Sequence, residues 1–290
     1  MEALRNEIVQ GRKVFFILPD KSLIAPNFME EYLNQAYECY IIDNDINIPI
    51  QKKIGAVLDV FKDSILFFNI DYNLKGLSWH KIIENVKNKY PTVTIGVIFA
   101  KRNSPAEKAA IENEYIRGLG IIGGCIELDY QKKNNYFLIE KFLFANQARG
   151  RRTQVRALCQ RNCSFNLDDK RGNVVTYWLN DLSLSHFSFT VPEDDKKFNI
   201  KDYERVSSLS FVIKGIRFTS DAVLFLKRET PTGILYVFAF VLPNGQLGLD
   251  PNLKNRIQPK IYELLCDTCF DLLKKTYDFI EIDPYTGNLI

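Results

Sequence analysis

The sequence lacks any apolar run of the about 18 residues that a membrane-spanning helix requires. Its first ten residues, MEALRNEIVQ, are charged and amphipathic and contain no hydrophobic segment of the kind that a secretory signal needs. Glycine and proline are not enriched, with 15 and 11 residues in 290, which excludes collagen-like and low-complexity chains. We therefore expect a folded cytoplasmic protein without a membrane span, and the length predicts two domains.

Acidic residues are absent between Lys141 and Leu167, and this gap coincides with a cluster of arginines. Residues 1–148 carry 18 basic and 18 acidic side chains, so the formal charge of +3 comes wholly from the remainder. Five arginines lie there within thirteen positions: Arg149, Arg151, Arg152, Arg156 and Arg161. A charge this localised favours a compact anion site over a basic surface for long nucleic acid. The alternative is a solvated, charged linker.

A glycine-rich phosphate loop is also absent. Such a loop follows a strand and opens a helix, whereas Gly118, Gly120, Gly123 and Gly124 precede a strand-like segment. We interpret these four as turn glycines. The sequence therefore predicts no dinucleotide site of this type in the first half of the chain.

The cysteines do not form a convincing metal site. Cys159 and Cys163 are spaced C-x3-C, and Cys266 and Cys269 are spaced C-x2-C, which raises a zinc hypothesis. The second pair, however, interrupts an apolar run at helical spacing and is typical of small core residues. In a cytosolic chain of this length we expect free thiols, no disulfides and no metal.

The first predicted domain, residues 1–146, alternates strand-like and helix-like segments. The apolar strand-like runs are residues 13–18, 39–42, 64–70, 92–100 and about 121–128. The helix-like segments are residues 27–37, 50–61, one around 79–86, one that starts at Pro105 after a Ser104 cap, and about 136–149. Five β–α units with nearly continuous apolar strands predict a five-stranded, doubly wound parallel sheet with helices on both faces.

The second predicted domain, residues 147–290, is rich in β-strand patterns. The clearest strands are residues 174–179, 187–191, 208–213, 222–227 and 234–242, separated by turn signals at 168–173, 192–195 and 231–233. An amphipathic helix from about Asn255 to Tyr277 follows, and Pro259 predicts a break or bend in it. This pattern predicts an antiparallel barrel that is closed by a C-terminal helix.

The five β–α units resemble the receiver domain of bacterial response regulators in architecture. A working receiver holds Mg²⁺ and an aspartyl phosphate with acidic, hydroxyl and lysine side chains at its strand ends. Here the first strand ends at Asp20 beside a lysine, and Asn69 occupies the position of the phosphate acceptor, with Asp71 out of step. Lys101 stands where the hydroxyl belongs, and Glu127 stands near the position of the lysine. We therefore expect an interaction module without phosphotransfer.

Two motifs in the second half resemble the paired signature of PilZ domains, the bacterial receptors for cyclic di-GMP. Arg152 and Arg156 form R-x-x-x-R after a further arginine, Arg151, and Asp181 and Ser183 form D-x-S on the predicted barrel. The resemblance covers about residues 147–277. It implies a β-barrel closed by a helix, and it leaves the first domain outside.

By this resemblance, Arg152 and Arg156 grip the phosphates and stack on guanine, with Arg151 assisting. Asp181 and Ser183 hold guanine edges and the ligand backbone, because a carboxylate accepts the N1–H and N2–H pair of guanine. His186 stands where the family has glycine. An imidazole there either obstructs the pocket, stacks on a base, or is an ordinary strand residue.

The leading hypothesis is a PilZ effector, not an enzyme, with cyclic di-GMP as ligand and no cofactor. Ligand binding at the arginine-rich interdomain linker would reorient the domains and control an unidentified protein partner, and the family resemblance implies motility as the process. The alternative is a ligand-free adaptor whose two domains are docking surfaces. No aromatic residue interleaves the arginines, so no nucleic-acid partner is expected.

Overall fold

The computed structural model describes residues 10–160, 162–168, 174–192, 200–201, 203–283 and 289. Arg161, most of the predicted turns at 168–173 and 192–195, and most of the tail from Pro284 lie outside these residues. The chain forms two compact units. The first comprises Met1–Val155 with Cys269–Ile290, and the second comprises Arg156–Thr268.

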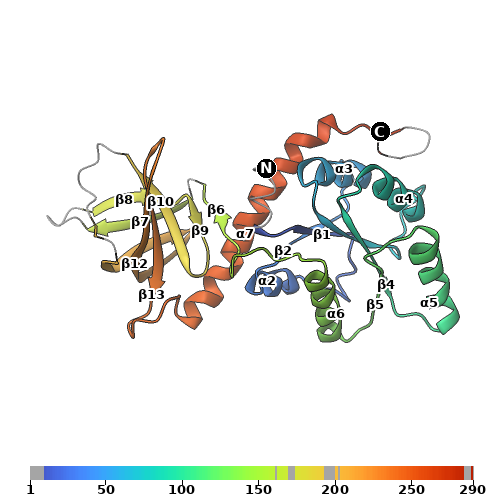
Figure 1. The fold of residues 1–290 in the computed structure, drawn as a ribbon, viewed down its shortest axis with the longest axis horizontal. Helices are drawn as coiled ribbons and strands as arrows, with labels where there is room; N and C mark the ends of the chain where they lie inside the picture. Colours follow the sequence, from blue (N-terminus) through green and yellow to red (C-terminus); the bar gives the residue numbers. More distant parts are fainter. Residues whose placement is uncertain are drawn as a thin grey trace. The chain divides into compact units, whose positions relative to one another are not determined.

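Five parallel strands form the sheet of the first unit (Figure 1). They are β1 (Lys13–Ile17), β2 (Glu38–Ile42), β3 (Ile65–Asn69), β4 (Thr94–Ala100) and β5 (Cys125–Leu128), in the order β2-β1-β3-β4-β5. β1 and β3 are central, and nearly all of their side chains are buried, which explains their continuous apolar sequences. The predicted doubly wound parallel sheet is confirmed, because this strand order reverses direction between β1 and β3.

Helices cover both faces of this sheet. They are α2 (Asn27–Asn34), α3 (Ile50–Val60), α4 (Trp79–Lys89), α5 (Pro105–Glu112) and α6 (Lys132–Ala145). α2 and α6 lie on one face, where the rings of Tyr32 and Tyr136 stack at 4.6 Å, and α3 and α4 lie on the other (Figure 1). Ser104 caps α5 as predicted and forms a capping box with Glu107. A π-helical segment, η1 (Asn113–Gly118), follows α5 and was not predicted.

Eight antiparallel strands form a curled sheet, a half-barrel, in the second unit (Figure 1). They are β6 (Ala157–Leu158), β7 (Cys163–Asp168), β8 (Val174–Trp178), β9 (Asp181–Leu182), β10 (His186–Val191), β11 (Arg205–Ile213), β12 (Ile216–Thr230) and β13 (Gly233–Val241). Their order is β6-β9-β10-β13-β12-β11-β7-β8. Stacked phenylalanines fill its core, for example Phe187 and Phe238 with ring centroids 5.4 Å apart. The predicted antiparallel barrel with a C-terminal helix is confirmed.

The C-terminal helix α7 (Pro251–Thr276) contributes to both compact units. Lys214, in the turn between β11 and β12, forms an ion pair with Asp267 and lies 3.7 Å from Glu263, and these contacts attach the first part of α7 to the half-barrel. α7 is a single helix and is not broken at Pro259. A proline removes one backbone hydrogen bond, and burial of apolar residues such as Ile261 offsets that loss.

The last part of α7 packs within the first unit. The ring of Phe270 meets Tyr40 of β2 edge to face, with centroids 6.1 Å apart, and η2 (Tyr277–Phe279) continues toward Ile280, which lies against Gly55 of α3. The predicted border after residue 146 assigns the whole helix to the second domain, so the compact units divide the chain differently. None of the helices in the described ranges is long and apolar enough to cross a membrane.

Candidate functional site

Four of the six predicted ligand residues lie together at one edge of the half-barrel. Arg156 directly precedes β6, Asp181 opens β9, and His186 opens β10 after a turn that contains Ser183. β6 pairs with β9 and β9 pairs with β10. Side chains on neighbouring antiparallel strands meet on a shared face. This strand order therefore brings Arg156, the second arginine of the R-x-x-x-R motif, beside the D-x-S motif.

The carboxylate of Asp181 is incompletely satisfied. Its Oδ1 lies 3.7 Å from Nη1 of Arg156, which is close enough for an ion pair and too far for a hydrogen bond. This oxygen is buried and accepts no hydrogen bond from any residue that the structure describes. Ser188 lies opposite Asp181 in the β9–β10 register, and its buried Oγ has no described partner either. Two adjacent polar groups on this face can therefore engage a polar ligand.

The side chain of Ser183 forms hydrogen bonds within the turn between β9 and β10. Its side chain is buried, and its hydroxyl accepts a hydrogen bond from the amide of His186 at 3.0 Å and lies 3.2 Å from the carbonyl oxygen of the same residue. The Ser183 amide also donates to this carbonyl at 2.8 Å. Here the serine of the D-x-S motif fixes the direction in which the chain enters β10.

His186 has ordinary strand backbone geometry, since it is not among the residues with positive φ. Its Nδ1 lies 2.7 Å from Oγ of Ser185, and its ring meets the ring of Phe225 edge to face, with centroids 5.3 Å apart. Burial lowers the pKa of His186, Arg156 lowers it further, and Asp181 opposes both. The imidazole is therefore mainly neutral at neutral pH.

Sequence reasoning missed Phe225. The available signal is the run Leu224-Phe225-Leu226, because three successive apolar residues cannot all face the core of an alternating strand. The structure has a register shift between Leu224 and Leu226 in the β12–β13 pair, and Phe225 is 55% exposed. β-bulges redirect side chains in this way and are frequent near binding sites.

The remaining predicted residues, Arg151 and Arg152, belong to the first unit, and Arg152 is half-buried. Backbone contacts hold the start of the arginine segment in that unit. The amide of Arg12 donates to the carbonyl of Ala148 at 2.9 Å, and Gly11 and Arg149 form an isolated antiparallel β-bridge. A cavity of about 900 Å³ lies there, and its lining includes Arg149 and Arg151. The segment is thus anchored up to residue 149.

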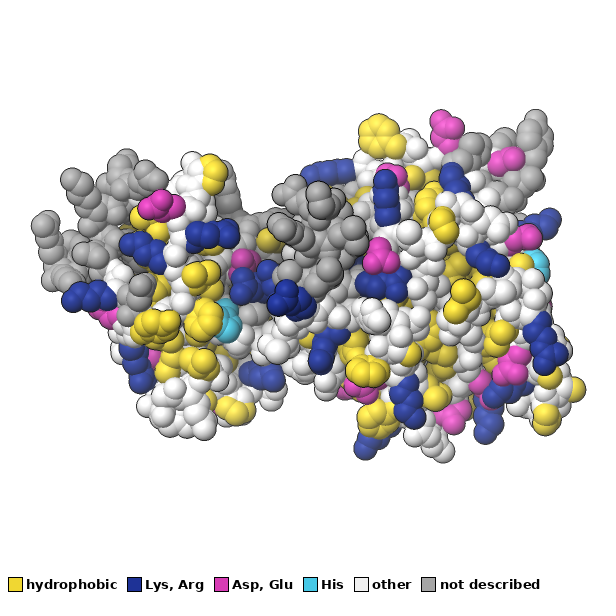
Figure 2. Space-filling model, in the orientation of Figure 1, with side chains coloured by type: hydrophobic (Ala, Val, Ile, Leu, Met, Phe, Trp, Pro, Cys, Tyr) yellow, Lys and Arg dark blue, Asp and Glu magenta, His cyan; other side chains and the backbone are white. Residues whose placement is uncertain are grey.

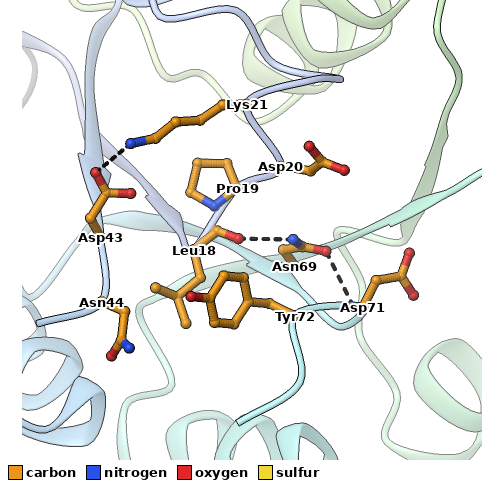
Figure 3. Close-up of a pocket in the computed structure, with 9 residues that line it drawn as sticks. All are labelled: Leu18, Pro19, Asp20, Lys21, Asp43, Asn44, Asn69, Asp71 and Tyr72. Carbon is orange, nitrogen blue, oxygen red and sulfur yellow. Dashed lines mark hydrogen bonds and ion pairs between the residues drawn. The ribbon is translucent and has the colours of Figure 1, made fainter. Parts of the chain in front are cut away.

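A second pocket, of about 560 Å³, lies at the carboxyl ends of β1 and β3 (Figure 3). Asn69 at the end of β3 is buried, and its amide donates to the carbonyl of Leu18 at 2.8 Å. Its side-chain oxygen accepts from the amide of Asp71 at 3.2 Å. Figure 3 shows Lys21 directed to Asp43, with which it forms an ion pair of 2.9 Å. Asn69 therefore joins two loops of this pocket.

Asp71 in this second pocket is already fully engaged. Its carboxylate accepts the amide of Ala100 at 2.6 Å and forms an ion pair with both Nη atoms of Arg102, one of them at 3.3 Å. Arg102 is thereby held across the ends of β3 and β4. A carboxylate that is fixed in this way is a poor nucleophile for phosphate transfer, because its lone pairs and charge are already stabilised.

Among the described residues, no group of three or more His, Cys, Asp or Glu side chains is placed to hold a metal ion. All six cysteines are free thiols. Cys163 and Cys269 are buried, while Cys159 and Cys266 are partly exposed.

No family model matches the chain, and no curated protein matches it in sequence. Among solved structures, it is similar to YcgR of Escherichia coli in complex with c-di-GMP, with 19% identity and a TM-score of 0.35 over 43% of this chain and 50% of that chain. It is also similar to the PilZ domain of YcgR with c-di-GMP, with 17% identity and a TM-score of 0.32 over 41% of this chain and 94% of that chain.

A third similar structure is the MrkH–c-di-GMP complex of K. pneumonia, with 14% identity and a TM-score of 0.31 over 44% of this chain and 57% of that chain. The chain matches about half the length of YcgR and MrkH. All three TM-scores are below 0.5.

Proposed function

We propose that the chain binds cyclic di-GMP at the β6–β9–β10 edge, with Arg156 and Asp181 as central residues. The single observation that carries this proposal is the buried Oδ1 of Asp181, which lacks a described hydrogen-bond donor and lies beside the guanidinium of Arg156. Guanine presents two adjacent N–H donors that suit a carboxylate, and a phosphodiester suits a guanidinium fork. One ligand therefore satisfies both groups.

The arginine segment supplies the rest of the anion site. Arg151 and Arg152 precede Arg156, and no acidic residue lies between Lys141 and Leu167 to compete for them in the local sequence. A ligand with two phosphates offsets the electrostatic repulsion between guanidinium groups that lie near each other. Residues 151–155 join the segment anchored at Arg149 to the half-barrel, so ligand binding there fixes the joint between the two units. We propose that this ordering controls a protein partner and involves no enzymatic step.

Isothermal titration of the full chain with cyclic di-GMP tests the proposal. We expect a saturable heat for the wild type and its loss in the double variant Arg152→Ala and Arg156→Ala. Arg205→Ala is the matched control, because Arg205 forms an ion pair with Asp221 on the same half-barrel, at 2.6 Å. The proposal fails if the wild type gives no heat with tens of micromolar protein, or if the double variant binds as well as the wild type.

A ligand-free adaptor is the second candidate. It is favoured by the ion pair between Arg156 and Asp181, which partly neutralises the site, and by the engagement of Asp71 with Arg102 in the first unit. The adaptor needs no ligand to present its surfaces. A pull-down that recovers the same protein partner in equal amount with and without cyclic di-GMP would support it over the receptor.

A further inference from the structure

Phe225 presents a large aromatic surface next to the proposed ligand residues. More than half of its side chain is exposed, and the bulge in β12 turns it away from the phenylalanine core. Figure 2 shows hydrophobic side chains gathered on the exposed surface of the half-barrel, close to Lys and Arg side chains. Exposed Phe225 and Leu226 are two of the apolar side chains on the surface of this unit.

The strand register explains why Phe225 meets His186. His186 of β10 pairs with Ala239 of β13. On the other side of β13, Ala239 pairs with Val223 of β12, which lies two residues before Phe225. Ala239 has a small side chain, so the two larger rings can approach each other above β13. Asp181 of β9 pairs with Ser188 of β10, so these two side chains lie on the same face of the sheet. Side chains two residues apart in one strand also share a face. Ser188 and His186 are two apart, so the ring pair and the unsatisfied carboxylate lie on the same face of the sheet.

The imidazole of His186 is oriented by a neighbouring hydroxyl, and its ring meets that of Phe225 at a steep angle. The contact between Nδ1 of His186 and Oγ of Ser185, at 2.7 Å, orients the imidazole, and the angle of 77° between the rings forms a corner. A flat base can lie against the face of one ring while its edge meets the other. Aromatic side chains stack on nucleobases without depending on base identity, and a neutral ring avoids the cost of burying a charge.

We propose that His186 and Phe225 form a stacking corner for a guanine base of cyclic di-GMP. Phe225 is a ligand-contacting residue, and His186 occupies the glycine position of the motif as part of this corner. This inference rests on the proposed function, because it deepens the description of the same site. The stacking corner contacts the planar face of the base, while Arg156 contacts a phosphate and Asp181 accepts the N–H groups of guanine.

Titration calorimetry on three single variants tests the corner. We expect Phe225→Ala and His186→Ala to weaken cyclic di-GMP binding by about 10-fold or more, which is the usual effect of removing an aromatic partner of a base. Phe225→Trp keeps the stacking surface and should retain the affinity. Tyr130→Ala is the control, because Tyr130 is an exposed aromatic residue of the first unit. Unchanged thermal unfolding of each variant verifies that it is folded.

Proton NMR gives a second readout, because the chain contains two histidines. On addition of cyclic di-GMP, the imidazole C–H signals that are missing in His186→Gln should move upfield through the ring current of a stacked base. Those of His80, which pairs with Glu114 at 2.8 Å in the first unit, should stay in place.

The outcomes separate this inference from the proposed function. If the wild type binds and Arg156→Ala abolishes binding, while Phe225→Ala and His186→Ala bind as the wild type does, the stacking corner is wrong and the receptor proposal stands. If the wild type itself shows no binding, both are wrong.

Discussion

Arg156 and Asp181 form an ion pair across the β6–β9 edge in which the buried Oδ1 of Asp181 receives no hydrogen bond from the described residues. At 3.7 Å this pair is loose, so neither partner has its hydrogen-bonding capacity filled by the other. An incoming ligand that donates to Asp181 and accepts from Arg156 exchanges one weak contact for two charge-assisted hydrogen bonds. The β6–β9 edge thus presents opposite charges to a ligand that carries both kinds of group.

The variant Asp181→Asn should lose affinity for cyclic di-GMP by about 10-fold or more. An amide offers one acceptor oxygen in place of two, and its NH₂ group faces the donors of guanine. Titration calorimetry measures the change. Asp221→Asn, which removes the partner of Arg205 on the same half-barrel, is the control and should bind as the wild type does. Equal affinities for Asp181→Asn and the wild type would contradict the role of this carboxylate.

Stability at mildly acidic pH should depend on His186. Burial, and then Arg156, lower its pKa below the ordinary 6.5, against the opposing effect of Asp181. The unfolded chain therefore takes up the proton at a higher pH than the native protein does. The contribution of neutral His186 to stability is complete above about pH 6.5 and is lost as the pH falls toward the native pKa.

The variant His186→Gln should lose less stability than the wild type between pH 7.5 and pH 5.5. Denaturant midpoints at the two pH values measure the difference, and His80→Gln reports the contribution of the other histidine. Equal losses for the wild type and His186→Gln would show that His186 does not titrate in this window.

Arg12 should be a major contributor to the stability of the first unit. Its guanidinium donates to the carbonyl oxygens of Asp63, Asn146 and Ser64 at 3.1, 3.1 and 3.2 Å. The variant Arg12→Ala should lower the free energy of unfolding by about 2 to 4 kcal/mol, because it leaves these carbonyls without a donor. Urea unfolding measures the loss. Arg117→Ala, at an exposed position of η1, should change it by less than about 0.5 kcal/mol.

Gly123 and Gly124 should differ in their tolerance of a methyl group. A Cβ at Gly123 would lie 2.2 Å from the carbonyl oxygen of Ile95 and 2.8 Å from the ring of Phe142, so Gly123→Ala forces a backbone shift. Gly124 has a φ of +88° with open space around it, so its substitution costs backbone strain alone. We expect losses of about 2 to 4 kcal/mol and about 1 kcal/mol, measured by urea unfolding. Equal losses would contradict the steric explanation.

The parallel sheet was predictable because most of its strands are nearly continuous apolar runs between helical patterns. β1 and β3 are buried on both faces, so their sequences carry that signal without interruption. The Ser104 cap was predictable for a local reason, since its partner is Glu107 three residues later. β6 and β9 were not predicted, because each has only two residues, which are too few to show an alternating pattern. Their pairing depends on neighbours that are distant in the sequence.

The sequence by itself determined where the charges and the motif residues lie: the arginine cluster, Asp181, Ser183, and a histidine in place of glycine. Only the tertiary structure decided which of them remain available. Ser183 is occupied by its own turn, whereas Oδ1 of Asp181 receives no hydrogen bond from any residue that the structure describes. The contact of His186 with Phe225 is of the same kind, because strand order and a bulge create it. Linear spacing holds no information on such contacts, since they depend on which strands pair and in which register.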